Sequence, residues 1–371
     1  MHDPSLLPLP PQPDATPLPT GEWPAGPMTD PVDSGRFADL LDTAFGSDAP
    51  AELGLTQAVV VIQHGTLVAE RYGEPFHSEL DALSETGPLV PGPDTTMISW
   101  SMAKSMLHAV IGQQVGRGAI DLDEPAPVPE WSSAGDPRGA ITWRHLLTMS
   151  PALEWAEDYV DEGVSDVIQM LFGSGADDMA AYAADKPLVA RPGHRYNYSS
   201  GTSNILARCL QRVLGLEGDA DGMAAHLRSA LFEPIGMTSA IPKFDPAGTF
   251  VASSYVYATA RDFARFGLLY LRDGVWDGRR VLPEGWVDTA REPTETDPER
   301  RHSAHWWVQP DGLGTFACDG YEGQRIVLVP ALDLVVVRLG KTPAPPDPPP
   351  GQPAPPHPVE KWIDQLVACF A

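Results

Sequence analysis

Apolar runs with strand periodicity lie near both ends of this 371-residue chain, and the segments between them are mainly helical in pattern. The late strand candidates are separated only by turn-like segments, as antiparallel strands are. These observations predict an α/β (α+β) fold in which N- and C-terminal strands build one antiparallel β-sheet flanked by helices. A mainly helical domain is inserted between the two groups of strands.

The composition is that of a globular protein with a large acidic excess. The chain has 50 Asp and Glu against 25 Lys and Arg, a formal net charge of −25, and 43% apolar residues. Nucleic acids and anionic membrane surfaces require basic patches, so we expect neither as a partner. The start of the chain lacks the basic and apolar features of a secretory signal, and no apolar run approaches membrane-spanning length. We therefore expect a cytoplasmic protein.

Metal and disulfide chemistry is not indicated. The three cysteines, Cys209, Cys318 and Cys369, are odd in number, and their spacing suits neither a disulfide framework nor a zinc site. His302 and His305 lack an acidic partner in a zinc-binding pattern. We expect no metal and no cofactor.

The N-terminal part combines an arm, a helix and a hairpin. Residues 1–31 are proline-rich and predict an extended, partly polyproline II arm that is either free or packed on a surface. Residues 37–45 have the pattern of a short amphipathic helix. Two β-rich runs, 57–62 and 66–72, flank the turn signal His64-Gly65 and predict a hairpin.

The middle of the chain is predicted to be mainly helical. Helices are expected at residues 143–149, 164–172, 177–184, 202–214 and 223–231. We assign residues 116–250 to the inserted domain and residues 32–115 with 251–371 to the sheet domain. The active site is expected between the two.

The C-terminal part returns to strands. A helix is predicted at residues 259–271, and an amphipathic helix at 359–370 should pack on the sheet. Ten prolines between Pro343 and Pro358 exclude a central strand or helix there. Strands are predicted at residues 306–308, 325–329 and 334–339.

The chemistry is expected at Ser101 and Lys104, three residues apart at the start of a helix that continues through residues 107–115. A residue at i+3 shares the helix face, and the first turn lies at the positive end of the helix dipole. Serine becomes a nucleophile when a base is within hydrogen-bond reach, and lysine can be that base if burial lowers its pKa. One such pair is close to chance, so by itself it is a weak indication.

Two further segments have properties that an acyl-transfer site needs. Tyr198 lies in a polar loop just before a helix, where a phenol can point into a cleft and shuttle a proton. Taken alone, it is better explained as a tyrosine packed at a helix start. Gly320 and Gly323 permit close approach of backbone N–H groups to a substrate oxyanion, although a plain hairpin with a glycine turn has the same pattern.

In this order the three segments resemble the motifs of the serine β-lactamase and penicillin-binding-protein superfamily: Ser101-x-x-Lys104, Tyr198-Ser199-Ser200 and Cys318-Asp319-Gly320. The chain is most similar to class C-like serine hydrolases, namely esterases of the β-lactamase fold and 6-aminohexanoate-dimer hydrolases. The similarity covers residues 55–340 and implies a β-lactamase/transpeptidase-like fold. Further matching positions are residues 146–150, 154–155, 158–159, 191–193, 262–267 and 323–324.

The resemblance implies a role for each matching residue. Ser101 matches the acylated nucleophile, Lys104 the lysine that activates it, and Tyr198 the tyrosine that shuttles the proton. The backbone N–H of Tyr321 would complete the oxyanion hole with that of Ser101. Tyr159 matches a substrate-capping tyrosine of the nylon-oligomer hydrolases.

Two positions depart from the family pattern. Ser200 stands where the Y-x-N motif has asparagine, and Cys318 stands where β-lactamases have lysine and many esterases have histidine. That lysine helps to bind the β-lactam carboxylate, and Asp319 would repel a carboxylate further if it faces the cleft. Together with Gly320, these residues are expected to contact the substrate.

The sequence therefore predicts a serine hydrolase that cleaves a carboxylic ester or linear amide through an acyl-enzyme on Ser101. Two alternatives stay open: a β-lactamase or D,D-peptidase-type penicillin-binding protein, and a non-catalytic binding protein of the same fold. The expected partner is a small-molecule ester or amide substrate, and a homodimer is left open.

Overall fold

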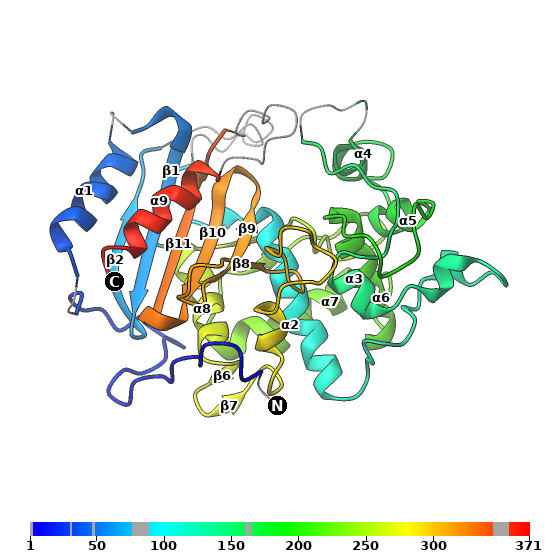
Figure 1. The fold of residues 1–371 in the computed structure, drawn as a ribbon, viewed down its shortest axis with the longest axis horizontal. Coiled ribbons are helices and arrows are strands. Elements are labelled where there is room, and N and C mark those ends of the chain that lie inside the picture. Colours follow the sequence, from blue (N-terminus) through cyan, green and yellow to red (C-terminus); the bar gives the residue numbers. More distant parts are fainter. Residues whose placement is uncertain are drawn as a thin grey trace.

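The computed structural model describes residues 3–29, 32–46, 49–75, 89–159, 163, 165–343 and 356–371. In these residues a six-stranded antiparallel sheet of order β2-β1-β11-β10-β9-β8 lies beside a group of helices (Figure 1). The strands are β1 (Leu55–Gln63), β2 (Thr66–Tyr72), β8 (Trp307–Val308), β9 (Phe316–Gly320), β10 (Gln324–Val329) and β11 (Leu334–Lys341). The sheet joins strands from both ends of the chain, which confirms the predicted fold class.

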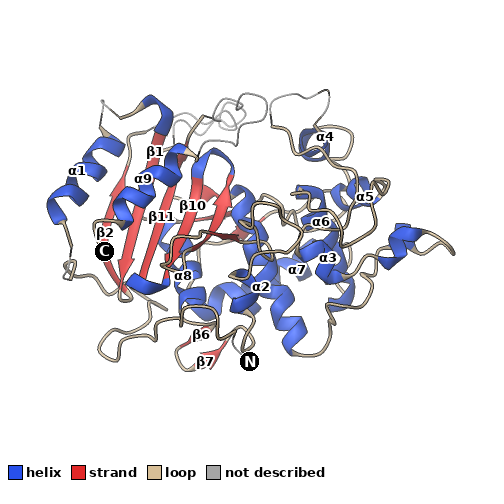
Figure 2. Cartoon of the chain, in the orientation of Figure 1, coloured by secondary structure: helices blue, strands red, loops and turns tan. Residues whose placement is uncertain are grey.

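Helices cover both faces of this sheet (Figure 2). Val59 and Val61 of β1 belong to the apolar cluster of α1 (Ser34–Phe45) and α9 (Pro358–Val367) on one face. Val60, on the opposite side of the same strand, belongs to the cluster of α8 (Ala260–Leu271). Since both sides are buried, residues 58–62 of β1 form an unbroken apolar run and not an alternating one.

The predicted hairpin, the first amphipathic helix and the last helix are all confirmed by β1–β2, α1 and α9. The sequence did not predict a small sheet of order β3-β5-β4, nor the β6–β7 hairpin. These strands are β3 (Met97–Ile98), β4 (Ile241–Pro242), β5 (Val256–Ala258), β6 (Val275–Trp276) and β7 (Arg279–Arg280). Two or three residues are too few to show a strand periodicity.

Helix α2 (Ala103–Gly116) runs between the sheet and the other helices (Figure 1). Its side chains are buried on every side from Ala103 to Gln114, as expected for a helix at the centre of a protein. The helices beyond it are α3 (Trp143–Leu147), α4 (Asp166–Phe172), α5 (Met179–Ala184), α6 (Ser200–Leu214) and α7 (Ala220–Leu227). They fall within residues 116–250, and the exact domain boundaries stay a prediction.

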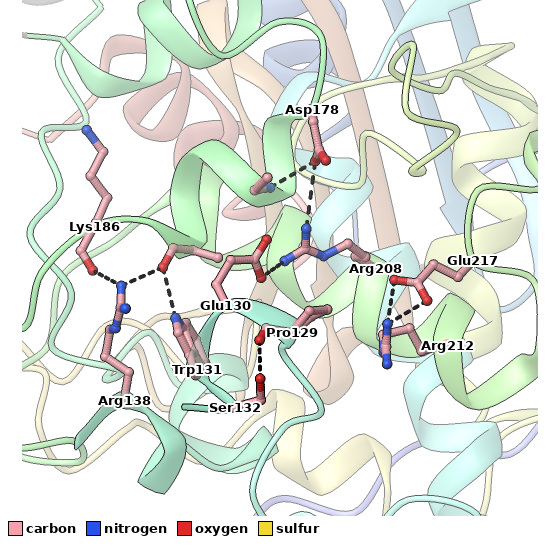
Figure 3. Close-up of polar contacts among 12 residues, drawn as sticks. Pro129, Glu130, Trp131, Ser132, Arg138, Asp178, Lys186, Arg208, Arg212 and Glu217 are labelled. Atoms are coloured by element: carbon pink, nitrogen blue, oxygen red, sulfur yellow. Dashed lines mark hydrogen bonds and ion pairs between the residues drawn. The ribbon is translucent and has the colours of Figure 1, made fainter. Parts of the chain in front are cut away.

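Polar contacts of buried Trp131 and Arg208 and their neighbours hold the helical part together (Figure 3). Arg208 of α6 pairs with Glu130 and lies 3.9 Å from the Asp178 carboxylate before α5. The indole of Trp131 and the guanidinium of Arg138 both donate to the carbonyl oxygen of Ala184, at 2.8 and 3.0 Å. These contacts fix both ends of α5 and the middle of α6, and α6 begins two residues after Tyr198.

The described part of the N-terminal arm packs on the body of the protein. Arg265 of α8 donates to the carbonyl oxygens of Pro19 and Gly21, at 2.6 and 2.5 Å. Arg272, just after α8, donates to the side chain of Gln12 at 2.7 Å. The packed form of the predicted arm is therefore the one observed.

Two further sequence predictions concern the second proline-rich segment and membrane-spanning helices. Most of the proline-rich segment 343–358 lies outside the described residues, which omit 344–355. Within the ranges that the structure describes, no helix is long and apolar enough to cross a membrane.

Candidate active site

Ser101 lies in a short 3₁₀ turn, Trp100–Met102, that connects β3 to α2. Trp100 has a φ of 44°, a left-handed conformation that is costly for a bulky side chain. Its ring packs against those of Tyr255 and Tyr321, with centroids 6.0 and 5.7 Å away. The packing holds the turn, and the turn presents the Ser101 side chain to a surface cleft.

Lys104 is buried directly beneath Ser101, with 2% of its surface exposed. Its Nζ atom lies 2.9 Å from Ser101 Oγ, 3.1 Å from Ser200 Oγ and 2.8 Å from the carbonyl oxygen of Ser253. Burial lowers the pKa of Lys104 to about 8, although the nearby Glu157 carboxylate raises it. About a tenth of the lysine is therefore neutral at pH 7, and that fraction can act as a base.

Tyr198 lies next to the same lysine, with Lys104 Nζ 5.1 Å from its ring centroid. Burial and the Glu157 charge raise the pKa of the phenol, although its interaction with Ser101 lowers it. The ring packs against His302 and Trp307, with centroids 5.7 and 5.5 Å away. The phenol therefore stays protonated at neutral pH and can donate a proton at the nucleophile.

The end of β9 approaches the turn that carries Ser101. A Cβ atom on Gly320 would lie 2.5 Å from the carbonyl oxygen of Ser99, so only glycine fits there. This contact brings the backbone of Tyr321 alongside the start of α2. The Tyr321 ring stacks on Tyr159, with centroids 4.8 Å apart and planes at 27°.

These elements surround a cleft of about 250 Å³. Most of the residues expected at the site from sequence line it together with Trp307 and Arg325. The lining residues are Ser101, Tyr159, Tyr198, Trp307, Asp319, Gly320, Tyr321, Glu322, Arg325, Thr342 and His357.

Two residues that were predicted to contact the substrate do not line the cleft. Cys318 is fully buried, and because strand residues alternate between faces, its side chain points into the core while Asp319 points into the cleft. Burial raises the pKa of the Cys318 thiol, although its interaction with Ser105 lowers it. Ser200 is 1% exposed, and its hydroxyl lies between Lys104 and Glu157. Neither side chain lines the cleft.

Three charged residues at the site were missed from sequence, and Glu322 at the wall of the cleft is one of them. Glu157 accepts hydrogen bonds from the N–H and hydroxyl of Ser200, at 2.9 and 2.5 Å. Arg325 of β10 is buried, forms an ion pair with Asp319 and lines the cleft. A charged residue in the otherwise apolar segment 325–329 was a signal for Arg325, whereas no sequence pattern marked Glu157.

The two histidines considered for metal binding lie behind Tyr198. His305 hydrogen-bonds to Ser203 Oγ at 3.0 Å and to the carbonyl oxygen of Leu147 at 2.8 Å. Burial lowers the pKa of His305 to about 3 and that of His302 well below its usual value, so both are neutral. Among the described residues there is no group of three or more His, Cys, Asp or Glu that could hold a metal ion.

The structure combines an antiparallel sheet shared by both chain ends, a helical insertion, and a Ser-x-x-Lys pair at the start of the central helix. Together these features define the serine β-lactamase and penicillin-binding-protein superfamily. The Beta-lactamase family model matches residues 50–354, and the chain belongs to this family.

Individual relatives agree with this assignment. The 6-aminohexanoate-dimer hydrolase of Paenarthrobacter ureafaciens is 28% identical over an alignment of 310 residues that covers 78% of this chain and 74% of that protein. A candidate 6-aminohexanoate-dimer hydrolase from Bacillus anthracis superimposes with a TM-score of 0.68 at 21% identity, covering 94% of this chain and 86% of its own. The octameric penicillin-binding protein homologue from Pyrococcus abyssi superimposes with a TM-score of 0.63 at 19% identity, covering 91% and 77%. These structures have the same fold.

Proposed function

We propose that this protein is a serine hydrolase that cleaves a carboxylic ester or a linear amide through an acyl-enzyme on Ser101. The observation that carries the proposal is the 2.9 Å contact between Nζ of buried Lys104 and Oγ of Ser101. A base with its pKa lowered to about 8 and within hydrogen-bond reach is what a serine hydroxyl requires to attack a carbonyl carbon.

The reaction proceeds in two halves. Neutral Lys104 accepts the Ser101 proton as Oγ bonds to the substrate carbonyl carbon, and the backbone N–H groups of Ser101 and Tyr321 stabilise the resulting oxyanion. Tyr198 donates a proton to the leaving oxygen or nitrogen as its bond to carbon breaks, and is reprotonated from Lys104. Water then attacks the acyl-enzyme, with the same groups transferring its protons, and releases the carboxylic acid.

The cleft favours an uncharged substrate. Tyrosine and tryptophan side chains make up four of its lining residues, and the carboxylate of Asp319 forms an ion pair with Arg325. No lysine stands at position 318, where β-lactamases place the group that helps to bind the β-lactam carboxylate. The Paenarthrobacter relative is named as a hydrolase of 6-aminohexanoate dimer, which supports a hydrolase over a binding protein.

A fluorophosphonate probe tests the nucleophile. Intact-mass measurement should find one covalent adduct on the parent protein and none on Ser101→Ala. Equal labelling of the two proteins would remove Ser101 from the mechanism.

A substrate panel separates the alternatives. Short-chain nitrophenyl esters and linear amides should be hydrolysed, and nitrocefin should be hydrolysed slowly. Rapid nitrocefin turnover would favour a β-lactamase, and labelling without turnover of any substrate would favour a binding protein.

A further inference from the structure

The hydroxyl group of Ser200 links the candidate base to a carboxylate. It lies 3.1 Å from Lys104 Nζ and 2.5 Å from Glu157 Oε1. Ser200 is the first residue of α6, and its backbone N–H donates to the other carboxylate oxygen of Glu157 at 2.9 Å. The carboxylate therefore holds Ser200 at two points, at the positive end of the helix.

An ionised carboxylate only accepts hydrogen bonds, and this one is saturated with donors. Besides the two from Ser200, Glu157 accepts from the Tyr159 hydroxyl at 2.6 Å and from the Trp155 indole at 2.5 Å. Because Glu157 cannot donate, the hydroxyl proton of Ser200 must point toward it. The lone pairs of Ser200 Oγ are then left for Lys104.

This arrangement decides where the lone pair of neutral Lys104 points. Among the described residues, Nζ has three hydrogen-bond partners: Ser101 Oγ, Ser200 Oγ and the Ser253 carbonyl oxygen. A carbonyl oxygen only accepts, and Ser200 Oγ is made to accept by Glu157. A neutral amine has two hydrogens, which these two acceptors take. The lone pair is left facing Ser101, whose hydroxyl proton it has to remove.

We infer that Glu157 is a positioning residue that acts through Ser200 to aim the lone pair of Lys104 at Ser101. The inference rests on the proposed function, since it matters only if Lys104 is the base. It also accounts for the departure at the second motif. An asparagine there has an amide oxygen that accepts in its own right, whereas a serine hydroxyl needs a partner to set its direction.

The charge of Glu157 has a separate effect, on the pH at which Lys104 loses its proton. Glu157 raises the pKa of Lys104 against the lowering by burial, so its removal should move that pKa below about 8. The other ionisable groups facing the lysine are Tyr198, whose phenol is neutral, and His302 and His305, whose imidazoles are neutral. Ser200→Ala keeps the charge of Glu157 but removes the oriented acceptor, so the two variants separate the two effects.

The test measures the rate of fluorophosphonate attachment to Ser101 by intact mass between pH 5 and 10, which needs no knowledge of the substrate. At high pH, where the labelling rate reaches its plateau, Glu157→Gln should label at least about tenfold more slowly than the parent. Its half-maximal rate should fall at a lower pH than that of the parent. Ser200→Ala should lose rate similarly, with its half-maximum at the parent's pH. Exposed Glu154, three residues away, provides the matched control Glu154→Gln, which should behave as the parent.

The outcomes distinguish this inference from the proposed function. If the parent is not labelled at any pH, or is labelled equally without Ser101, the proposed function fails and the inference with it. If Ser101 is labelled and both variants keep the parent's plateau, the inference alone fails. If Glu157→Gln labels more slowly but its half-maximal rate stays at the parent's pH, the role of Glu157 is merely structural. Thermal unfolding checks each fold, and Ser200→Ala decides the question if Glu157→Gln does not fold.

Discussion

Gly320 packs on Ser99 so closely that a Cβ atom there would lie 2.5 Å from the Ser99 carbonyl oxygen. The contact joins two parts of the chain that are far apart in sequence: the end of β9 and the turn that precedes Ser101. It brings the two backbone segments that are candidates for the oxyanion hole next to each other. The requirement for glycine is steric, because the backbone of Gly320 is extended.

Gly320→Ala should therefore impair both stability and activity. The added methyl must push β9 away from the turn, at a cost of about 1–3 kcal/mol in the free energy of unfolding. Ester hydrolysis should fall by about tenfold or more because the oxyanion donors separate. Gly21→Ala is the control, since nothing lies within 4 Å of its Cβ position. A Gly320→Ala protein that unfolds in urea and turns over substrate as the parent does would contradict the close approach of Gly320 to Ser99.

The pH dependence of kcat/KM should report the ionisation of Lys104. Burial lowers its pKa to about 8, and only the neutral amine accepts the Ser101 proton. The rate should therefore rise about tenfold per pH unit below pH 8 and level off above it. Lys104→Ala should abolish turnover, while exposed Lys361→Ala should keep the parent profile. A flat profile between pH 6 and 9 would be incompatible with Lys104 as the base.

Tyr198→Phe should separate proton transfer from packing. The phenyl ring keeps its contacts with His302 and Trp307, so the midpoint of thermal unfolding should change little. Loss of the phenol should lower kcat by about 10²–10⁴-fold, because the phenol pKa is raised and the neutral hydroxyl is the proton donor. The neighbouring Tyr196→Phe serves as control. Similar kcat values for the two variants would exclude Tyr198 as the donor.

The N-terminal arm should contribute to stability without contributing to the chemistry. Its carbonyl oxygens and the Gln12 side chain accept hydrogen bonds from Arg265 and Arg272, which are buried beneath it. Deletion of residues 1–22 uncovers both guanidinium groups and should lower the midpoint of thermal unfolding by several degrees. Fluorophosphonate labelling of Ser101 below that midpoint should persist. Deletion of residues 1–4 is the milder comparison, and an unchanged midpoint in the longer deletion would refute the role of the arm.

The local sequence pattern was sufficient to predict much of the fold and the residues at the centre of the site. The β1–β2 hairpin and the amphipathic helices α1 and α9 follow from periodicity and turn residues within each segment. Ser101 and Lys104 share one helix turn, so their spacing predicts their proximity before any tertiary contact is known.

Long-range packing decided which side chains face the cleft and which distant residues contact each other. The sequence pattern allows a hairpin with a glycine turn at Gly320 and Gly323, but which of two adjacent side chains faces inward depends on what covers each side of the sheet. This packing puts Cys318 in the core and Asp319 in the cleft. The bond between Ser200 and Glu157 joins residues 43 apart. Such a contact has no sequence period, because it exists only once the 153–159 segment and the start of α6 are folded against each other.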